Sequence, residues 1–178
     1  MNISVEIVPS ADSGHDDALV AVLSFETFYE TERDGLFGAL VLITGSRHEA
    51  EELTQDAFVA LWERWARVSA LEDPTGYLYR TAMNAFRKRL RRTAMALRRV
   101  VGITPEQDAF AAADARQVVA AALAGLSRRQ RAALVLTELL GFSSEDAGRA
   151  LGIKPVTVRV LASQGRAAMK KSVGASDE

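Results

Sequence analysis

Helical periodicity constrains the fold of this chain more than any other feature. Apolar residues recur every three or four positions, and no stretch shows the sustained apolar–polar alternation of a strand. Serine or aspartate stands before most of the periodic runs and glycine after them, as at the starts and stops of helices. The pattern predicts an all-α protein in which two small helical modules are joined by a flexible linker.

The capping residues predict three helices in the first module and four shorter ones in the second. The expected helices of the first module are residues 24–44, 47–68 and 74–99. Those of the second are residues 115–124, 128–140, 143–151 and 155–172. Gly45 is placed to end the first helix, Ser46 with Glu49 is a capping-box pattern, and Asp73-Pro74 is a typical start.

The expected helices divide the chain into five parts. These are an acidic arm (1–23), the first module (24–99), a linker (100–113), the second module (114–173) and a tail (174–178).

Charge is distributed very unevenly, although the formal net charge is only −1. Residues 87–99 hold seven basic residues and no acidic one, and residues 1–24 hold four acidic residues and no Lys or Arg. Because binding depends on local patches, the overall charge does not exclude a polyanionic partner. The basic block is either a solvated helix end or a phosphate-binding surface, and its one-sided charge favours the latter.

Several functional classes are excluded by residues that the sequence lacks. The chain has no cysteine and only two histidines, far apart, which argues against a metal site. It has no run of eighteen apolar residues, and its first basic residue is Arg33, so we expect no membrane insertion and no signal peptide. Phosphate-loop, dinucleotide and nucleophile-elbow motifs are also missing. We therefore expect a cytoplasmic protein that is not an enzyme, with no catalytic residues, metal or cofactor.

The second expected helix carries an apolar stripe and an acidic one. The apolar residues, which we expect in the core, are Leu53, Ala57, Leu61 and Trp65, with Phe58 and Trp62 beside them. The acidic stripe consists of Glu49, Glu52, Asp56 and Glu63. Such a stripe is usually only solvated, and its alternative is a docking surface for a basic partner. The sequence alone does not separate the two.

The third expected helix combines an apolar face with a polar stripe. The apolar residues are Tyr79, Ala82, Met83, Phe86 and Leu90, and the stripe consists of Arg80, Asn84, Arg87 and Arg91. Guanidinium groups bind phosphates and an amide binds base edges. Tyr77 and Tyr79 pack in the core or stack on unpaired bases. The combination favours single-stranded or melted nucleic acid as the ligand.

Residues 143–159 have the spacing of a helix-turn-helix, with Gly148 where two helices touch and Gly152 at the turn. The exposed early positions of its second helix would enter a major groove: Lys154, Val156, Thr157, Arg159, Val160, Ser163 and Gln164. Basic residues around it would contact phosphates: Arg128, Arg129, Arg131, Arg166, Lys170 and Lys171. An ordinary αα-hairpin is the alternative.

Four motifs, in order, resemble those of the bacterial extracytoplasmic-function (ECF) sigma factors, the minimal members of the sigma-70 family. They are FETFY (25–29), AEELTQDAFVALW (50–62), YLYRTAMN followed by RKRLRR (77–84 and 87–92), and LSRRQR (126–131) with the helix-turn-helix. The resemblance covers residues 24–173. It implies a promoter-specificity subunit that recognises −10 and −35 elements and melts the −10 element.

The resemblance also implies partners and site residues. The β′ clamp helices of core RNA polymerase would bind Glu49, Glu52, Gln55 and Asp56. The −10 element would bind Tyr77, Tyr79, Arg80, Asn84, Arg87, Lys88 and Arg91. The −35 element would bind Arg129, Lys154, Val156, Thr157, Arg159, Val160, Ser163, Gln164 and Arg166. The polymerase β subunit and an anti-sigma factor are further expected partners. A helix-turn-helix regulator that acts without polymerase is the alternative, in which the acidic stripe has no use.

Overall fold

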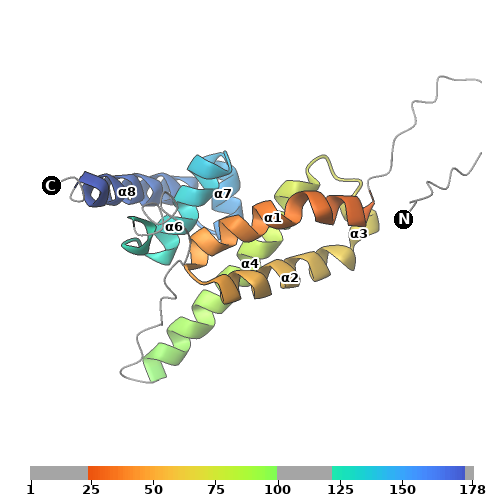
Figure 1. Cartoon of the computed structure of the whole chain (residues 1–178), viewed down its shortest axis with the longest axis horizontal. Coiled ribbons are helices and arrows are strands. Elements are labelled where there is room, and N and C mark those ends of the chain that lie inside the picture. The colour runs from red at the N-terminus through yellow and green to blue at the C-terminus, as the bar shows by residue number, and fades with distance from the viewer. Residues whose placement is uncertain (1–23, 100–121, 175–178) are drawn as a thin grey trace, which may run out of the picture.

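The computed structural model describes residues 24–99 and 122–174, and every regular element within them is a helix (Figure 1). The expected acidic arm and linker, the expected tail except Gly174, and most of the expected helix 115–124 lie outside the described residues. Among the described helices, none is both long and apolar enough to cross a membrane.

The first half contains α1 (Phe25–Thr44), α2 (Arg47–Trp62), α3 (Trp65–Val68) and α4 (Pro74–Arg99). The predicted stop at Gly45 is confirmed, since Gly45 ends α1 with a left-handed φ of 75°. Ser24, expected as the first helical residue, instead caps α1, and its hydroxyl accepts the Thr27 N–H at 3.1 Å. A carboxylate oxygen of Asp73 accepts the Gly76 N–H at 2.7 Å where α4 begins. The N-termini are fixed because these side chains satisfy backbone groups that have no partner inside the helix.

The single helix predicted over residues 47–68 is wrong, because the chain leaves the helical conformation at Arg64, whose φ is −127°. The break changes the direction of the chain, so that Trp65 of the short helix α3 packs against α1. The centroid of its ring lies 5.0 Å from that of Phe28 and 5.5 Å from that of Phe25. Trp62, on the other side of the break, is 64% exposed and does not belong to the core.

The core of the first half lies between α1, α2 and α4. Its largest fully buried side chains are Leu36, Leu40, Ile43, Leu53, Leu61, Leu78, Met83 and Phe86, with Val68 of α3. The predicted apolar face of α4 is confirmed, with Leu90 half-buried at its end. Burial of this face holds the polar stripe of α4 at the surface.

The second half contains α6 (Arg128–Leu134), the π-helical turn η1 (Val135–Leu139), α7 (Ser144–Leu151) and α8 (Pro155–Gly174). Residues 122–124, before α6, are also helical. The helix predicted to continue to residue 140 instead widens into η1, where the Leu140 N–H bonds to the Val135 carbonyl at 3.0 Å. Gly152 ends α7 with a φ of 62°, as the turn of the helix-turn-helix requires.

The two halves pack against each other through α1 with α6 and α4 with α7 (Figure 1). Their buried side chains form one continuous cluster, and the rings of Tyr79 and Phe142 meet edge to face across the boundary at 5.6 Å. The two predicted modules are therefore present, and they pack against each other. We call this packing of the two halves the closed arrangement.

Candidate functional site

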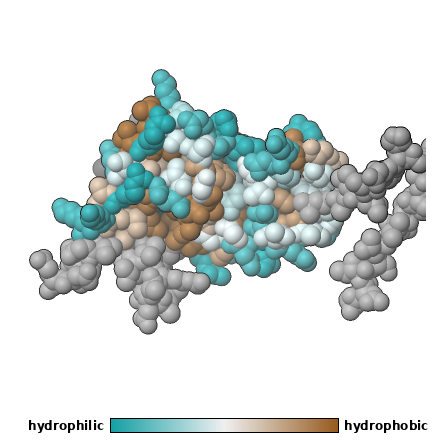
Figure 2. Space-filling view, turned by 90° about the horizontal axis from the view of Figure 1, so that it is seen from above, coloured by the Kyte–Doolittle hydropathy of each residue, from teal (hydrophilic) through white to brown (hydrophobic). Residues whose placement is uncertain are grey.

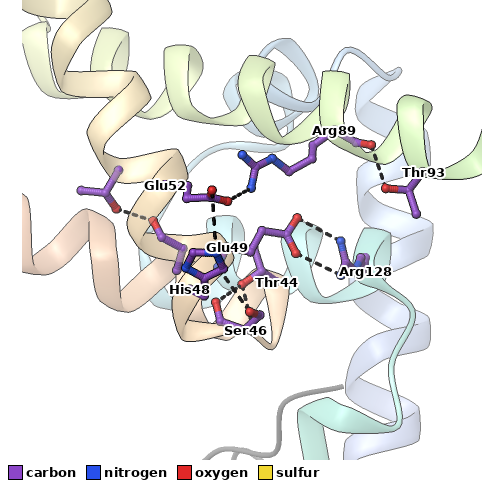
Figure 3. Close-up of polar contacts among 10 residues, drawn as sticks. Thr44, Ser46, His48, Glu49, Glu52, Arg89, Thr93 and Arg128 are labelled. Carbon is purple, nitrogen blue, oxygen red and sulfur yellow. Dashed lines mark hydrogen bonds and ion pairs between the residues drawn. The ribbon is translucent and has the colours of Figure 1, made fainter. Parts of the chain in front are cut away.

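The solvent-facing side of α2 is partly engaged and partly free. Glu49 accepts hydrogen bonds from Arg128 of α6 at 3.0 Å, and Glu52 accepts one from Arg89 of α4 (Figure 3). Only half of the predicted capping box forms, since the Ser46 hydroxyl accepts the Glu49 N–H at 3.2 Å while the Glu49 carboxylate binds Arg128. The bond from Arg89 lowers the pKa of Glu52.

The other end of this side of α2 is open to solvent. Gln55 and Asp56 are exposed, and so are Val59 (57%) and Trp62 (64%), two apolar side chains that the sequence analysis did not assign to a surface. An exposed tryptophan beside an exposed valine is typical of an interaction surface, because aromatic residues are enriched in protein interfaces. The sequence signal was available, since Trp62 lies off the core stripe of α2.

The predicted polar residues of α4 occupy three environments. Asn84, Lys88 and Arg91 are exposed. Arg80 is half-buried, with its Nη1 4.0 Å from a carboxylate oxygen of Asp73, and Tyr77 is half-buried, with its hydroxyl accepting a hydrogen bond from Arg67 at 3.3 Å. Tyr79 is buried, and this burial raises its pKa to about 12.

The residues expected to bind the −35 element are accessible to solvent. All nine of them are exposed: Arg129, Lys154, Val156, Thr157, Arg159, Val160, Ser163, Gln164 and Arg166. Val158 and Ala162 on the opposite side of α8 are buried and fix the helix to the rest of the second half. Gly148 permits the turn, because a Cβ there would lie 2.9 Å from the Ile153 carbonyl oxygen.

Two arginines cross the boundary between the halves and lie on glycines that end helices. The Arg131 guanidinium covers Gly45, where a Cβ would lie 2.6 Å from its Nη1. The Arg87 guanidinium covers Gly152, where a Cβ would lie 2.3 Å from its Cζ. Both positions favour a cation, because a helix C-terminus carries partial negative charge.

Arg131 does not have the surface position that the sequence suggested. It is 3% exposed, its Nη2 lies 3.5 Å from the Thr44 carbonyl oxygen, and its Nε has no hydrogen-bond partner. Burial lowers its pKa. The expectation that Arg131 contacts phosphates is wrong for this closed arrangement.

The described residues contain no cluster of three or more histidine, aspartate or glutamate side chains suited to a metal ion. A cavity of about 270 Å³ lies between the halves, lined by Phe86, Arg87, Leu90, Arg91, Arg129, Ala132, Leu151, Gly152 and Ile153. Its guanidinium groups belong to residues that the sequence predicts for the −10 and −35 surfaces.

Comparison with protein families gives two matches. The family model for sigma-70 region 2 matches residues 28–95, and the model for sigma-70 region 4 matches residues 116–169. The first contains α2, α3 and most of α1 and α4, and the second contains the helix-turn-helix.

Individual relatives give the same result. The chain is 29% identical over 159 residues to the ECF RNA polymerase sigma factor SigE of Mycolicibacterium smegmatis, an alignment that covers 82% of this chain and 60% of SigE. It is 26% identical over 152 residues to the ECF RNA polymerase sigma factor SigM of Mycobacterium tuberculosis, covering 85% of this chain and 78% of SigM.

Two solved structures share the fold. The sigma factor RpoE from Bartonella quintana, in complex with the anti-sigma factor NepR, superposes with a TM-score of 0.67 at 22% identity, covering 84% of this chain and 96% of that one. The PhyRSL–NepR complex from Sphingomonas sp. Fr1 gives a TM-score of 0.58 at 23% identity, covering 84% and 88%.

Proposed function

The chain belongs to the sigma-70 family, in its ECF group, and from this membership we propose that it directs core RNA polymerase to specific promoters. The single observation that carries the proposal is the order of two sigma regions, 2 and 4, in one chain. In this role the subunit does not itself catalyse a reaction. It would act in the cytoplasm, where polymerase binds promoters.

The free end of α2 is the proposed docking surface for the β′ clamp helices. Exposed Asp56 supplies charge complementary to a basic partner, which mainly sets orientation and association rate. Exposed Val59 and Trp62 add apolar area, which supplies the affinity that charge alone does not. A regulator that acts without polymerase would leave this surface unused.

Helix α4 is the proposed −10 surface. Asn84 is exposed, and its amide would hold a base extruded from the melted duplex, while Lys88 and Arg91 would bind phosphates. Extruding a base costs a few kcal/mol, so contacts in the receiving pocket select the sequence. Tyr79, buried against Phe142, would reach a base only after the halves separate.

Promoter binding therefore requires the closed arrangement to open. The Arg87 guanidinium lies on Gly152, so it cannot at the same time hold a promoter phosphate. Glu49 is engaged by Arg128 and is free for polymerase only when α6 leaves. Once polymerase fixes the spacing, the two weak DNA-binding surfaces on one chain would gain affinity through effective concentration.

An anti-sigma factor is a proposed partner as well. One structural neighbour, RpoE, is in complex with the anti-sigma factor NepR. The other is the PhyRSL–NepR complex. A partner that holds the closed arrangement would keep Glu49, Tyr79 and Arg87 engaged inside the protein and away from polymerase and promoter.

Charge reversal on α2 tests the docking assignment. Asp56→Arg places a cation where the basic clamp helices would bind, so we expect a more than tenfold loss of affinity for core polymerase in a binding titration. The matched control is Glu30→Arg on an exposed position of α1, which should leave the affinity unchanged. Equal affinity of the Asp56→Arg variant, with helicity intact, would remove the docking assignment.

A further inference from the structure

The groove-facing side of α8 is uncharged at its centre. Val156 and Val160 stand four residues apart and so share one side of the helix, where they are 53% and 49% exposed. Ser163 continues the same side. In the view from above, apolar surface lies beside hydrophilic surface at the end of the molecule that α6, α7 and α8 form (Figure 2).

The exposure of these two valines is not explained by a missing core partner. Val158 is fully buried on the other side of α8, and Ala162 is 3% exposed, so the packed side of the helix is already complete. Two valines in solvent at the start of the helix expose apolar area that a bound surface would cover.

Two cations of α8 pair with carboxylates of the same half. Arg159 lies 3.7 Å from a Glu145 oxygen, and Arg166 bonds to Glu138. Gln164 accepts a hydrogen bond from Gln130 at 3.4 Å. These polar side chains of α8 therefore already interact with other residues of the protein. The two valines are exposed on the same helix.

Major-groove chemistry gives such a surface one suitable target. Among the groups that base pairs present there, the thymine 5-methyl is the apolar group that projects furthest into the groove, and aliphatic side chains contact it. From this match we propose that Val156 and Val160 select the −35 element by contact with thymine methyl groups. The inference rests on the proposed function, because α8 must enter a −35 element for the contact to form.

The test begins with selection of the −35 element. Full-length protein with core polymerase is incubated with promoter duplexes randomised over the −35 region, in parallel with the Val156→Ala and Val160→Ala variants. Both positions are exposed, so we expect the variants to fold normally. The expected result is a thymine preference at two positions, one of which is lost in each variant.

Removal of the methyl group alone then isolates the contact. Each preferred thymine is replaced by uracil, and holoenzyme affinity is measured by competition. For the wild type we expect a loss of about fourfold per methyl group. The variant that lacks the facing valine should bind both duplexes equally. The control variant Lys171→Ala should weaken both by the same factor, since it removes a charge directed at phosphate and no contact with a base.

Each outcome is decisive. A selected element without thymine preference, or an equal response of wild type and valine variants to uracil, overturns the methyl contact while leaving promoter recognition intact. Failure to select any element with polymerase present overturns the proposed function as well.

Discussion

At the scale of one residue, Tyr79 shows the effect of the closed arrangement. From the sequence, this side chain could either pack in the core or stack on unpaired bases, and in the closed arrangement it is buried. Its ring is 5% exposed, it meets Phe142 of the other half, and burial raises its pKa to about 12. A phenol held in this environment stays protonated up to strongly alkaline pH, because its ionised form would be desolvated.

This shift predicts a pH dependence of stability. The folded-state pKa of Tyr79 is above its unfolded value, so the folded chain binds the proton more tightly. The stabilisation is fully present below about pH 10 and is lost as the pH rises toward 12, by about 2 kcal/mol. Urea unfolding of the wild type and Tyr79→Phe between pH 8 and 12 measures it. An identical decline in both proteins would contradict the assignment.

Capping residues made most helix boundaries predictable from the sequence. Ser24, Gly45, Ser143 and Gly152 all end or begin helices where expected. The break at Arg64 and the π-helical turn η1 were not predictable, because each is set by contacts distant in sequence or by one shifted hydrogen bond. Helix propensity depends on the local sequence and therefore does not predict either feature.

At the scale of the helices, substitution of two helical glycines by alanine is expected to change stability in opposite directions. Gly148→Ala places a Cβ 2.9 Å from the Ile153 carbonyl oxygen, so it should destabilise the helix-turn-helix by about 1–3 kcal/mol. Gly38→Ala in α1 meets nothing within 4 Å and should stabilise by about 0.5–1 kcal/mol. Thermal unfolding of the two variants measures both, and equal shifts would show that the close approach at Gly148 is not real.

At the scale of the whole molecule, the contact between the halves is the feature that the sequence did not reveal. The apolar face of α4 and the exposed surface of α8 followed from periodicity and spacing. The pairing of Glu49 with Arg128 did not, because it joins residues 79 positions apart and replaces a local capping interaction that the motif favoured. The acidic stripe of α2 was thus predicted from the sequence, whereas the contact of its Glu49 with α6 is seen only in the structure.

Reversal of one charge is expected to open the molecule. The Arg128 and Glu49 side chains are only 25% and 13% exposed, so Arg128→Glu opposes two poorly solvated carboxylates. Small-angle scattering should then give a larger radius of gyration. The double variant Glu49→Arg/Arg128→Glu should restore the wild-type value, and Arg129→Glu, an exposed neighbour, should leave it unchanged. An unchanged radius in Arg128→Glu would contradict the role of this pair in closure.

Run-off transcription tests the central claim most directly. Core polymerase is incubated with a pool of genomic fragments from the source organism, with and without the protein. We predict new discrete start sites that depend on the protein and share −10 and −35 sequences upstream. The absence of new start sites, together with salt-sensitive binding of the protein alone to duplex DNA, would contradict the claim and support a regulator that acts without polymerase.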